Sequence, residues 1–222
     1  MDVALRRMRP EDRNEVKEIE REAFAPLGVG TPFKREMNNR YARYLVAYFP
    51  EPPESRVQPE PPVLEDSSES ADVSIWSRML KNVQALVKHD ERTSTGKESD
   101  IAGYLGVWFQ GNEAHITEIA VRETLRGQGI GELLLIGSLR AALEYGSSVV
   151  TLEVRVSNFV AHRLYEKYGF KSAGVRKGYY ADNREDAVIM TTSPIHSETY
   201  RELFRELQEK YPDRWREIRI EN

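Results

Sequence analysis

Hydrophobic positions along the chain follow two different periods, which predict an α/β protein. In some segments apolar residues recur every three or four positions, the spacing of one helix face, and in others they form short strand-like runs. The predicted helices span residues 10–24, 129–145 and 159–168, with a short helix after Thr31-Pro32 and a last one between Ser193-Pro194 and Pro212. The predicted strands span residues 3–8, 44–48, 101–109, 113–121, 149–156, 170–180 and 186–191. The turn at 110–112 predicts an antiparallel hairpin of the strands beside it.

Two segments break this regular pattern. Residues 50–72 contain six prolines and seven acidic residues. Such a composition buries too little apolar surface to offset chain entropy, so we interpret it as a linker. Residues 73–87 carry apolar side chains on one helical stripe, which predicts a surface helix. We therefore expect one domain over 1–192, interrupted by an insertion at 50–100, and a helical extension over 193–222.

The net charge of −4 is set by the linker. Residues 50–72 carry −6, so the rest of the chain carries +2. A nearly balanced charge favours neither direct nucleic-acid binding nor attachment to a membrane. No run approaches the roughly 18 apolar residues of a membrane span, and the N-terminus lacks the apolar core of a signal peptide. We expect a cytoplasmic protein, and self-association as a dimer is left open.

The chain contains no cysteine. Disulfides, thiolate metal sites and a cysteine acyl-enzyme are therefore excluded. The four histidines are far apart in sequence and form no i, i+4 pair: His89, His115, His162 and His196. We expect no metal site.

The sequence from Arg126 to Gly131, RGQGIG, joins a predicted strand to a predicted helix. The first turn of a helix leaves backbone N–H groups without partners, and glycines let a phosphate approach them closely. We expect a pyrophosphate site here, to which Arg122 and Arg126 add positive charge. A P-loop is excluded because Glu132 follows the last glycine, and the glycine spacing differs from the dinucleotide fingerprint. The alternative is a tight turn without a ligand.

Motifs in and after this loop resemble a known family. Ile119-Ala120-Val121 followed by Arg126-x-x-Gly129-x-Gly131 is similar to the acetyl-CoA signature of the GNAT superfamily of acetyltransferases. Three later segments resemble the RimI-type N-terminal acetyltransferases, which modify the alanine of a ribosomal protein: LEVRVSN at 152–158, LYEKYGF at 164–170, and YY, DN and EDA within 179–187. The resemblance is loose over 3–48 and close over 101–192.

The resemblance implies a fold and a set of site residues. The fold is a central mixed, mostly antiparallel sheet, flanked by helices and splayed after its fourth strand, with acetyl-CoA as cosubstrate in the split. Glu153 is implied as the general base and Tyr165 as the proton donor to the departing thiolate. The implied coenzyme-binding residues are Ile119, Ala120 and Val121 beside the acetyl and pantetheine part, Arg126, Gly127, Gln128, Gly129, Ile130 and Gly131 around the pyrophosphate, and Asn158.

These roles suit the acetylation of an amine. An α-amine with a pKa of about 8 is deprotonated far more easily than a lysine at about 10.4, so a weak base such as Glu153 suffices. The leaving thiol has a pKa of about 8.5, so a phenol such as Tyr165, at about 10, can donate a proton as charge develops on sulfur. We expect direct transfer in a ternary complex, without an acetyl-enzyme.

Each assignment has a structural alternative. Glu153 can pair with Arg155 or Arg176 instead. Tyr165 can serve in core packing alone. Asn158 can cap the helix that it precedes, which is compatible with a coenzyme contact.

Candidate substrate-binding residues flank the expected site. Glu118 directly precedes the acetyl-facing strand segment and is a rival base to Glu153. Tyr179 and Tyr180, with Asp182, are expected to line the peptide entrance. Their alternative is an ordinary aromatic hairpin.

The sequence favours an enzyme that acetylates the N-terminal α-amine of a protein. The alternatives are an acetyltransferase for a small-molecule amine or a lysine side chain, and a non-catalytic acyl-CoA-binding regulator. A pure binder would need neither Glu153 nor Tyr165, so their joint presence favours an enzyme. The insertion and the C-terminal extension depart from the compact RimI pattern. The substrate, a ribosomal protein or another, is therefore left open.

Overall fold

The computed structural model describes residues 3–24, 30–50 and 101–211 of the 222-residue chain. The predicted linker, past Pro50, and the predicted helix at 73–87 lie outside the described residues. The described residues belong to one unit that spans residues 1–51 and 100–222.

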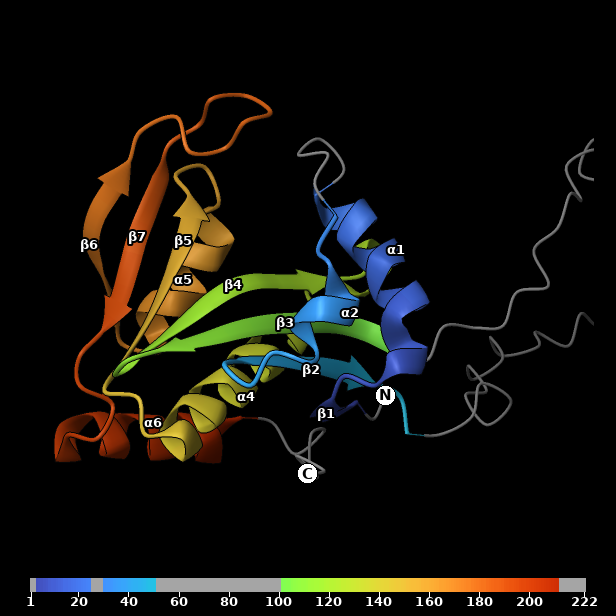
Figure 1. The fold of residues 1–222 in the computed structure, drawn as a ribbon. Helices are drawn as coiled ribbons and strands as arrows, with labels where there is room; N and C mark the ends of the chain where they lie inside the picture. Colours follow the sequence, from blue (N-terminus) through green and yellow to red (C-terminus); the bar gives the residue numbers. More distant parts are fainter. Residues whose placement is uncertain (1–2, 25–29, 51–100, 212–222) are drawn as a thin grey trace, which may run out of the picture. The chain divides into compact units, whose positions relative to one another are not determined.

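A seven-stranded sheet forms the centre of this unit (Figure 1). Its order is β1-β2-β3-β4-β5-β7-β6, and β4–β5 is its one parallel pair within the described residues. The strands are β1 Ala4–Arg7, β2 Ala42–Tyr48, β3 Ile101–Gln110, β4 Glu113–Val121, β5 Val149–Arg155, β6 Phe170–Arg176 and β7 Ala187–Thr192. The predicted mixed, mostly antiparallel sheet is confirmed.

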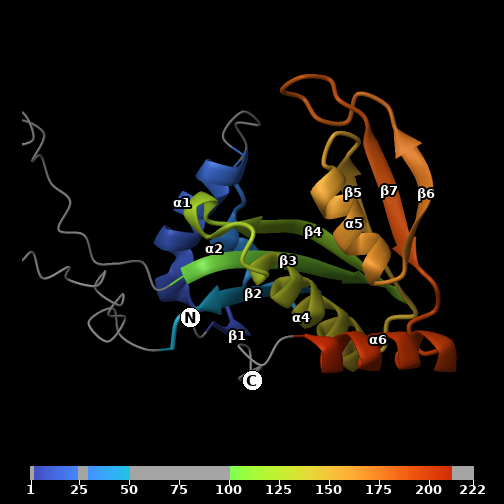
Figure 2. The ribbon, with the colours of Figure 1, turned by 180° about the vertical axis from the view of Figure 1, so that it is seen from behind.

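Helices cover both faces of the sheet (Figure 1, Figure 2). They are α1 Arg13–Phe24, α2 Phe33–Glu36, α4 Ile130–Tyr145, α5 Phe159–Lys167 and α6 Glu198–Lys210. α1 and α2 enclose one apolar cluster, and α4 packs into a second on the opposite face. α6 lies next to α4, at an angle to it, in both views, and its Tyr200 and Phe204 join the cluster of α4.

The sheet splits between β4 and β5. These strands pair only from Glu113–Val149 to Ile116–Leu152, and beyond that point they diverge (Figure 1). A bulge lies at the same place, because Gly106 on β3 faces Glu118 whereas Val107 faces Ile116. Thr117 is therefore an extra residue on β4. The predicted splay after the fourth strand is confirmed.

One predicted strand ends earlier than expected. The sequence predicts a strand to Tyr180, but β6 ends at Arg176. The Asp186 side chain accepts hydrogen bonds from the Gly178 amide at 2.8 Å and from Lys177 Nζ at 2.6 Å. Gly178 has a φ of 58°, which turns the chain away from the sheet. Beyond Arg176, hydrogen bonds to the Asp186 side chain therefore take the place of the backbone pairing between β6 and β7.

Candidate active site

The glycine-rich loop leads from β4 into the first turn of α4. Gly127 and Gly129 have φ angles of 76° and 89°, a region that favours glycine. Gly129 is the N-cap of α4, and its carbonyl accepts the Leu133 amide at 3.0 Å. The amides of the intervening turn have no partner within the helix. A Cβ added to Gly131 would meet only Val121, at 3.9 Å, so the space beside these amides suits a phosphate.

The two arginines predicted to assist this loop are oriented differently. Arg122 donates to the Ile101 carbonyl at 2.9 Å and pairs with Glu22 at 3.2 Å. The expectation that Arg122 binds the anion is therefore not supported, because its guanidinium joins β3 to α1. Arg126 is exposed, and its Nε donates to the Val121 carbonyl at 3.3 Å.

The charge of Glu132, in the first turn of α4, is neutralised from the side of α5. Its Oε1 accepts hydrogen bonds from Lys167 Nζ at 2.5 Å and from the Tyr168 hydroxyl at 2.7 Å. A carboxylate at this end of a helix would repel a bound anion if it were unpaired. The pairing makes the loop compatible with a diphosphate.

The segment Ile119–Val121 has one edge free of β5. It pairs with Gly103–Leu105 on β3, whereas β5 pairing stops at Ile116. Its backbone groups on the side of β5 are therefore positioned to meet an extended ligand between the diverging strands.

Glu118 lies beneath α1 and α2. Its carboxylate accepts the Tyr104 hydroxyl at 2.8 Å and the Thr31 hydroxyl at 3.3 Å. Burial raises the pKa of Glu118 to about 7, against the hydrogen bond from Tyr104, and the nearby Glu20 adds to the rise. Burial also raises the pKa of Tyr104. Glu118 is thus a carboxylate that changes charge near neutral pH.

Glu153 lies on the face of β5 away from the α4 cluster, because its neighbours Leu152 and Val154 point into that cluster. Its side chain is 7% exposed. Oε2 lies 3.1 Å from His115 Nε2, and Oε1 lies 3.0 Å from the guanidinium of Arg176. The structural alternative of an Arg176 pair is therefore present, but Arg155 does not take part.

His115 is the site residue that the sequence did not single out. Its Nδ1 lies 3.0 Å from Thr151 Oγ1, and the Thr151 hydroxyl donates to Glu113 at 2.6 Å. Because Thr151 has a single proton, His115 Nδ1–H must donate to Thr151, which leaves Nε2 facing Glu153. His115 and Arg176 thus flank the two oxygens of the Glu153 carboxylate.

Tyr165 lies on α5, with its ring centroid 5.7 Å from that of Phe170. It packs against the α4 cluster, as the core-packing alternative expects. Within the described residues, no side chain or backbone group hydrogen-bonds to its hydroxyl. Burial raises the pKa of Tyr165 above its ordinary value, so the phenol keeps its proton. A partly buried neutral phenol whose hydroxyl has no hydrogen-bond partner among the described residues suits a proton donor.

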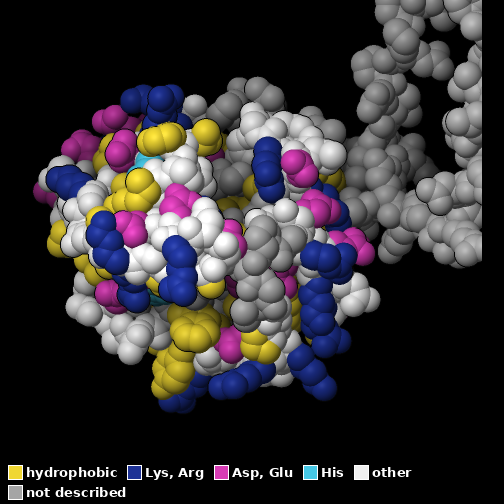
Figure 3. Space-filling model, turned by 90° about the horizontal axis from the view of Figure 1, so that it is seen from above, with side chains coloured by type: hydrophobic (Ala, Val, Ile, Leu, Met, Phe, Trp, Pro, Cys, Tyr) yellow, Lys and Arg dark blue, Asp and Glu magenta, His cyan; other side chains and the backbone are white. Residues whose placement is uncertain are grey.

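Asn158 caps α5, because its side-chain oxygen accepts the Ala161 amide at 3.2 Å. The next two residues are unusually exposed for apolar side chains, Phe159 at 68% and Val160 at 82%. Seen from above, hydrophobic side chains lie mostly on the half that carries β5, β6 and β7 (Figure 3). The start of α5 therefore presents an apolar surface next to Asn158.

The connection from β6 to β7 is tied to β5. Arg155 contacts both oxygens of Asp182 at 2.9 Å and pairs with Glu185 at 3.1 Å. Its guanidinium lies 3.9 Å from the centroid of the Tyr180 ring, which meets Tyr179 edge-on at 5.2 Å. Hydrogen bonds from Ser157, Arg155 and Asn183 lower the pKa of Glu185 to about 2. The two tyrosines are thus held as one unit above β5.

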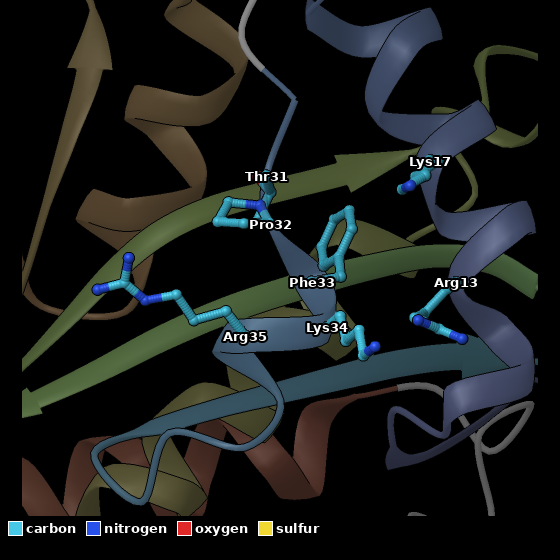
Figure 4. Close-up of a pocket in the computed structure, with 7 residues that line it drawn as sticks. All are labelled: Arg13, Lys17, Thr31, Pro32, Phe33, Lys34 and Arg35. Carbon is cyan, nitrogen blue, oxygen red and sulfur yellow. The ribbon is translucent and has the colours of Figure 1, made fainter.

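A groove of about 420 Å³ runs between α1 and α2 (Figure 4). Phe33 and Thr31 line it together with four cations, Arg13 and Lys17 from α1 and Lys34 and Arg35 from α2. Within the described parts of the chain, none of these cations forms an ion pair. The groove adjoins the candidate site, because Thr31 also hydrogen-bonds to Glu118.

The described residues contain neither a membrane-spanning helix nor a cluster of metal-ligating side chains. No helix in them is long and apolar enough to cross a membrane. No group of three or more His, Asp or Glu side chains there is placed to hold a metal ion. The absence of a metal site stays a prediction.

The fold and the loop define an acetyltransferase of the GNAT type. Residues 41–170 match the model of the Acetyltransferase (GNAT) family, to which the chain therefore belongs. Members of this family use acetyl-CoA. The loop amides and the open space at Gly131 fit its diphosphate.

Two relatives of known or assigned activity are similar to this chain in sequence. The chain is 32% identical over 189 residues to a Bacillus subtilis (strain 168) protein that is provisionally assigned as a ribosomal protein bS18-alanine N-acetyltransferase. That match covers 85% of this chain and 93% of the relative. This chain is also 47% identical over 79 residues to an N-alpha-acetyltransferase from Saccharolobus solfataricus. That second match covers 35% of this chain and 47% of the relative.

Solved structures show the same fold. The crystal structure of the ribosomal-protein-S18-alanine N-acetyltransferase from Escherichia coli matches with a TM-score of 0.57 at 23% identity, over 88% of this chain and 95% of that one. A GNAT family acetyltransferase from Elizabethkingia anophelis with acetyl-CoA bound matches with a TM-score of 0.52 at 14% identity, over 86% and 97% of the two chains.

Proposed function

We propose that the protein transfers the acetyl group of acetyl-CoA to the N-terminal α-amine of a protein. The observation that carries this proposal is the placement of Glu118 and Glu153 on the sheet face opposite α4, whose first turn forms the diphosphate site. The diverging strands thus separate a coenzyme side from a side with two carboxylates. The activities named for the bacterial and archaeal relatives support an α-amine as the acceptor.

In the proposed reaction, the amine nitrogen forms a bond to the acetyl carbon as the carbon–sulfur bond breaks. Glu153 takes the proton from the amine on its carboxylate, which His115 and Arg176 hold in place. Tyr165 donates its proton to the leaving sulfur, because its phenol is neutral and its hydroxyl has no partner among the described residues. No acetyl-enzyme forms.

Glu118 has a different proposed role, the reception of the substrate's α-ammonium. An ionised carboxylate attracts that cation, and the Tyr104 and Thr31 hydroxyls fix its orientation. Its pKa of about 7 allows it to be ionised in part of the enzyme at neutral pH. Glu118 therefore acts in binding, and Glu153 in proton transfer.

The groove between α1 and α2 is proposed to take the peptide residues that follow the acetylated one. Its cations favour acidic side chains at those positions. Arg35 lines the groove at the end away from Arg13 and Lys17 (Figure 4). Tyr179 and Tyr180 are proposed to contact the same peptide from the side of β5.

Peptide assays test this function. Peptides that start with Ala, Ser or Met are compared with free polyamines and with an N-terminally blocked lysine peptide, and mass spectrometry locates the acetyl group. Modification of the α-amine alone is expected. Preferential acetylation of polyamines or lysine would overturn the proposal, as would an absence of affinity for coenzyme A in calorimetry.

The residue roles are tested by three variants. Glu153→Gln is expected to lower kcat about a hundredfold and Tyr165→Phe about tenfold, because each removes one proton-transfer group. Glu118→Gln is expected to act mainly on the KM of the peptide. A collapse of kcat in Glu118→Gln, with little change in Glu153→Gln, would reverse the two roles.

A further inference from the structure

The C-terminal helix reaches the glycine-rich loop through one side chain. Tyr211 directly follows α6, and its hydroxyl donates a hydrogen bond to the Gly129 carbonyl at 2.7 Å. Gly129 is the N-cap of α4, and α6 lies next to α4, at an angle to it, in both ribbon views (Figure 1, Figure 2). Residues 82 positions apart therefore meet at the candidate diphosphate site.

The Gly129 carbonyl belongs to the same peptide unit as the Ile130 amide. It accepts two hydrogen bonds, one from the Leu133 amide at 3.0 Å and one from the Tyr211 hydroxyl. These bonds fix the plane of the peptide unit. They also polarise it, which strengthens the Ile130 N–H as a donor at the open end of α4.

A second contact joins α6 to the end of α5. The Tyr200 hydroxyl donates to the Tyr168 carbonyl at 2.9 Å, and the Tyr168 hydroxyl donates to Glu132 at 2.7 Å. Tyr168 ends the helix that carries Tyr165. α6 is thus connected both to the first turn of α4 and to the helix of the proposed proton donor.

We infer that α6 braces the diphosphate loop and that Tyr211 is a positioning residue for coenzyme binding. This inference rests on the proposed use of acetyl-CoA. Without the Tyr211 hydroxyl, the peptide unit of Gly129 and Ile130 has one anchor fewer, and the phosphate-facing amide is less well oriented. The C-terminal extension therefore contributes to the coenzyme side of the enzyme.

The variant Tyr211→Phe removes only the hydroxyl. We expect the KM for acetyl-CoA and the Kd for coenzyme A to rise about threefold to tenfold, the effect of one lost hydrogen bond, with kcat and the peptide KM unchanged. Tyr145→Phe is the matched control, because Tyr145 lies at the other end of α4 and stacks on Phe109. It is expected to bind coenzyme A like the wild type.

A shortened donor separates positioning from general loosening. S-acetylpantetheine lacks the diphosphate, so wild type and Tyr211→Phe are expected to use it with the same kcat/KM. Equal affinity of both proteins for coenzyme A would overturn the inference, and so would an equal loss with acetyl-CoA and S-acetylpantetheine. If the wild type itself binds no coenzyme A, the proposed function fails as well, which is a distinguishable result.

Discussion

Arg155 on β5 contacts both carboxylate oxygens of Asp182 at 2.9 Å, and this contact holds the connection between β6 and β7. A lysine keeps the charge but cannot form the same planar contacts. Arg155→Lys is therefore expected to raise the peptide KM about threefold to tenfold and to leave the acetyl-CoA KM unchanged. Steady-state kinetics with each substrate varied will measure both constants. Arg184→Lys, on the same connection, is the control, and an unchanged peptide KM in Arg155→Lys would refute the proposed role of Tyr179 and Tyr180.

The activity should depend on pH through Glu118. Burial raises its pKa to about 7, so Glu118 gains its charge as the pH rises through that value. For the wild type, kcat/KM for the peptide is expected to rise between about pH 6 and 8, because ionised Glu118 attracts the α-ammonium. Glu118→Gln should retain only the dependence from the substrate amine itself, which has a pKa of about 8. Parallel pH profiles of the two proteins would contradict this expectation.

The same carboxylate should affect stability. The folded-state pKa of Glu118 is raised above the ordinary value of 4.5, so the folded protein binds this proton more tightly than the unfolded chain. The contribution of Glu118 to the free energy of unfolding is therefore present below about pH 4.5 and is lost as the pH rises to about 7. Allowing for its partial exposure, we expect a loss of about 2 kcal/mol for the wild type relative to Glu118→Gln between pH 5 and pH 8. Urea unfolding at the two pH values measures it, and an equal change in both proteins would count against a raised pKa.

The orientation of His115 should depend on Thr151. Thr151→Val keeps the shape of the side chain but removes the oxygen that accepts His115 Nδ1–H. We expect kcat to fall about threefold to tenfold, with both KM values little changed. Thr191→Val is the matched control, because Thr191 pairs with Thr151 on the adjacent strand β7. A loss of the same size in both variants would mean that the sheet, and not the histidine, is disturbed.

Reversing charge in the groove between α1 and α2 should change the preferred peptide. Lys17→Glu with Lys34→Glu is expected to lower kcat/KM about tenfold for peptides with acidic residues after the first position, and to favour basic ones. Lys171→Glu, exposed on β6, is the control. The comparison is made at low and moderate salt, since exposed charges are screened. An unchanged ratio of acidic to basic peptides would exclude the groove as a peptide site.

The sequence predicted the elements because each depends on neighbouring residues. The helix from 129 to 145 has an apolar face and a glycine at each end, and α4 spans Ile130–Tyr145 between Gly129 and Gly146. The predicted strand over 170–180 is too long, because the Asp186 side chain that ends it comes from the residue just before β7. Such a contact leaves no periodic signal in the strand that it ends.

Much of the candidate site could not be predicted because it joins distant residues. His115 and Glu153 meet only because β4 and β5 pair in parallel, with His115 opposite Thr151. A weak signal was present, since Glu113, His115 and Thr117 alternate with apolar residues and so share one face. The hydrogen bond between Tyr211 and Gly129 could not be predicted either, because the position of Tyr211 on an amphipathic helix predicted only packing.

The extra residue Thr117 determines which face of the sheet each later side chain of β4 points to. Ile116 points toward the α4 side, yet Glu118, two positions later, faces α1 and α2. In a strand of unbroken alternation these two side chains would share a face. The bulge at Thr117 instead places Glu118 on the side of α1 and α2, while Ile119 and Val121 pack on the side of α4. One irregular position thus keeps the Glu118 carboxylate out of the apolar cluster of α4.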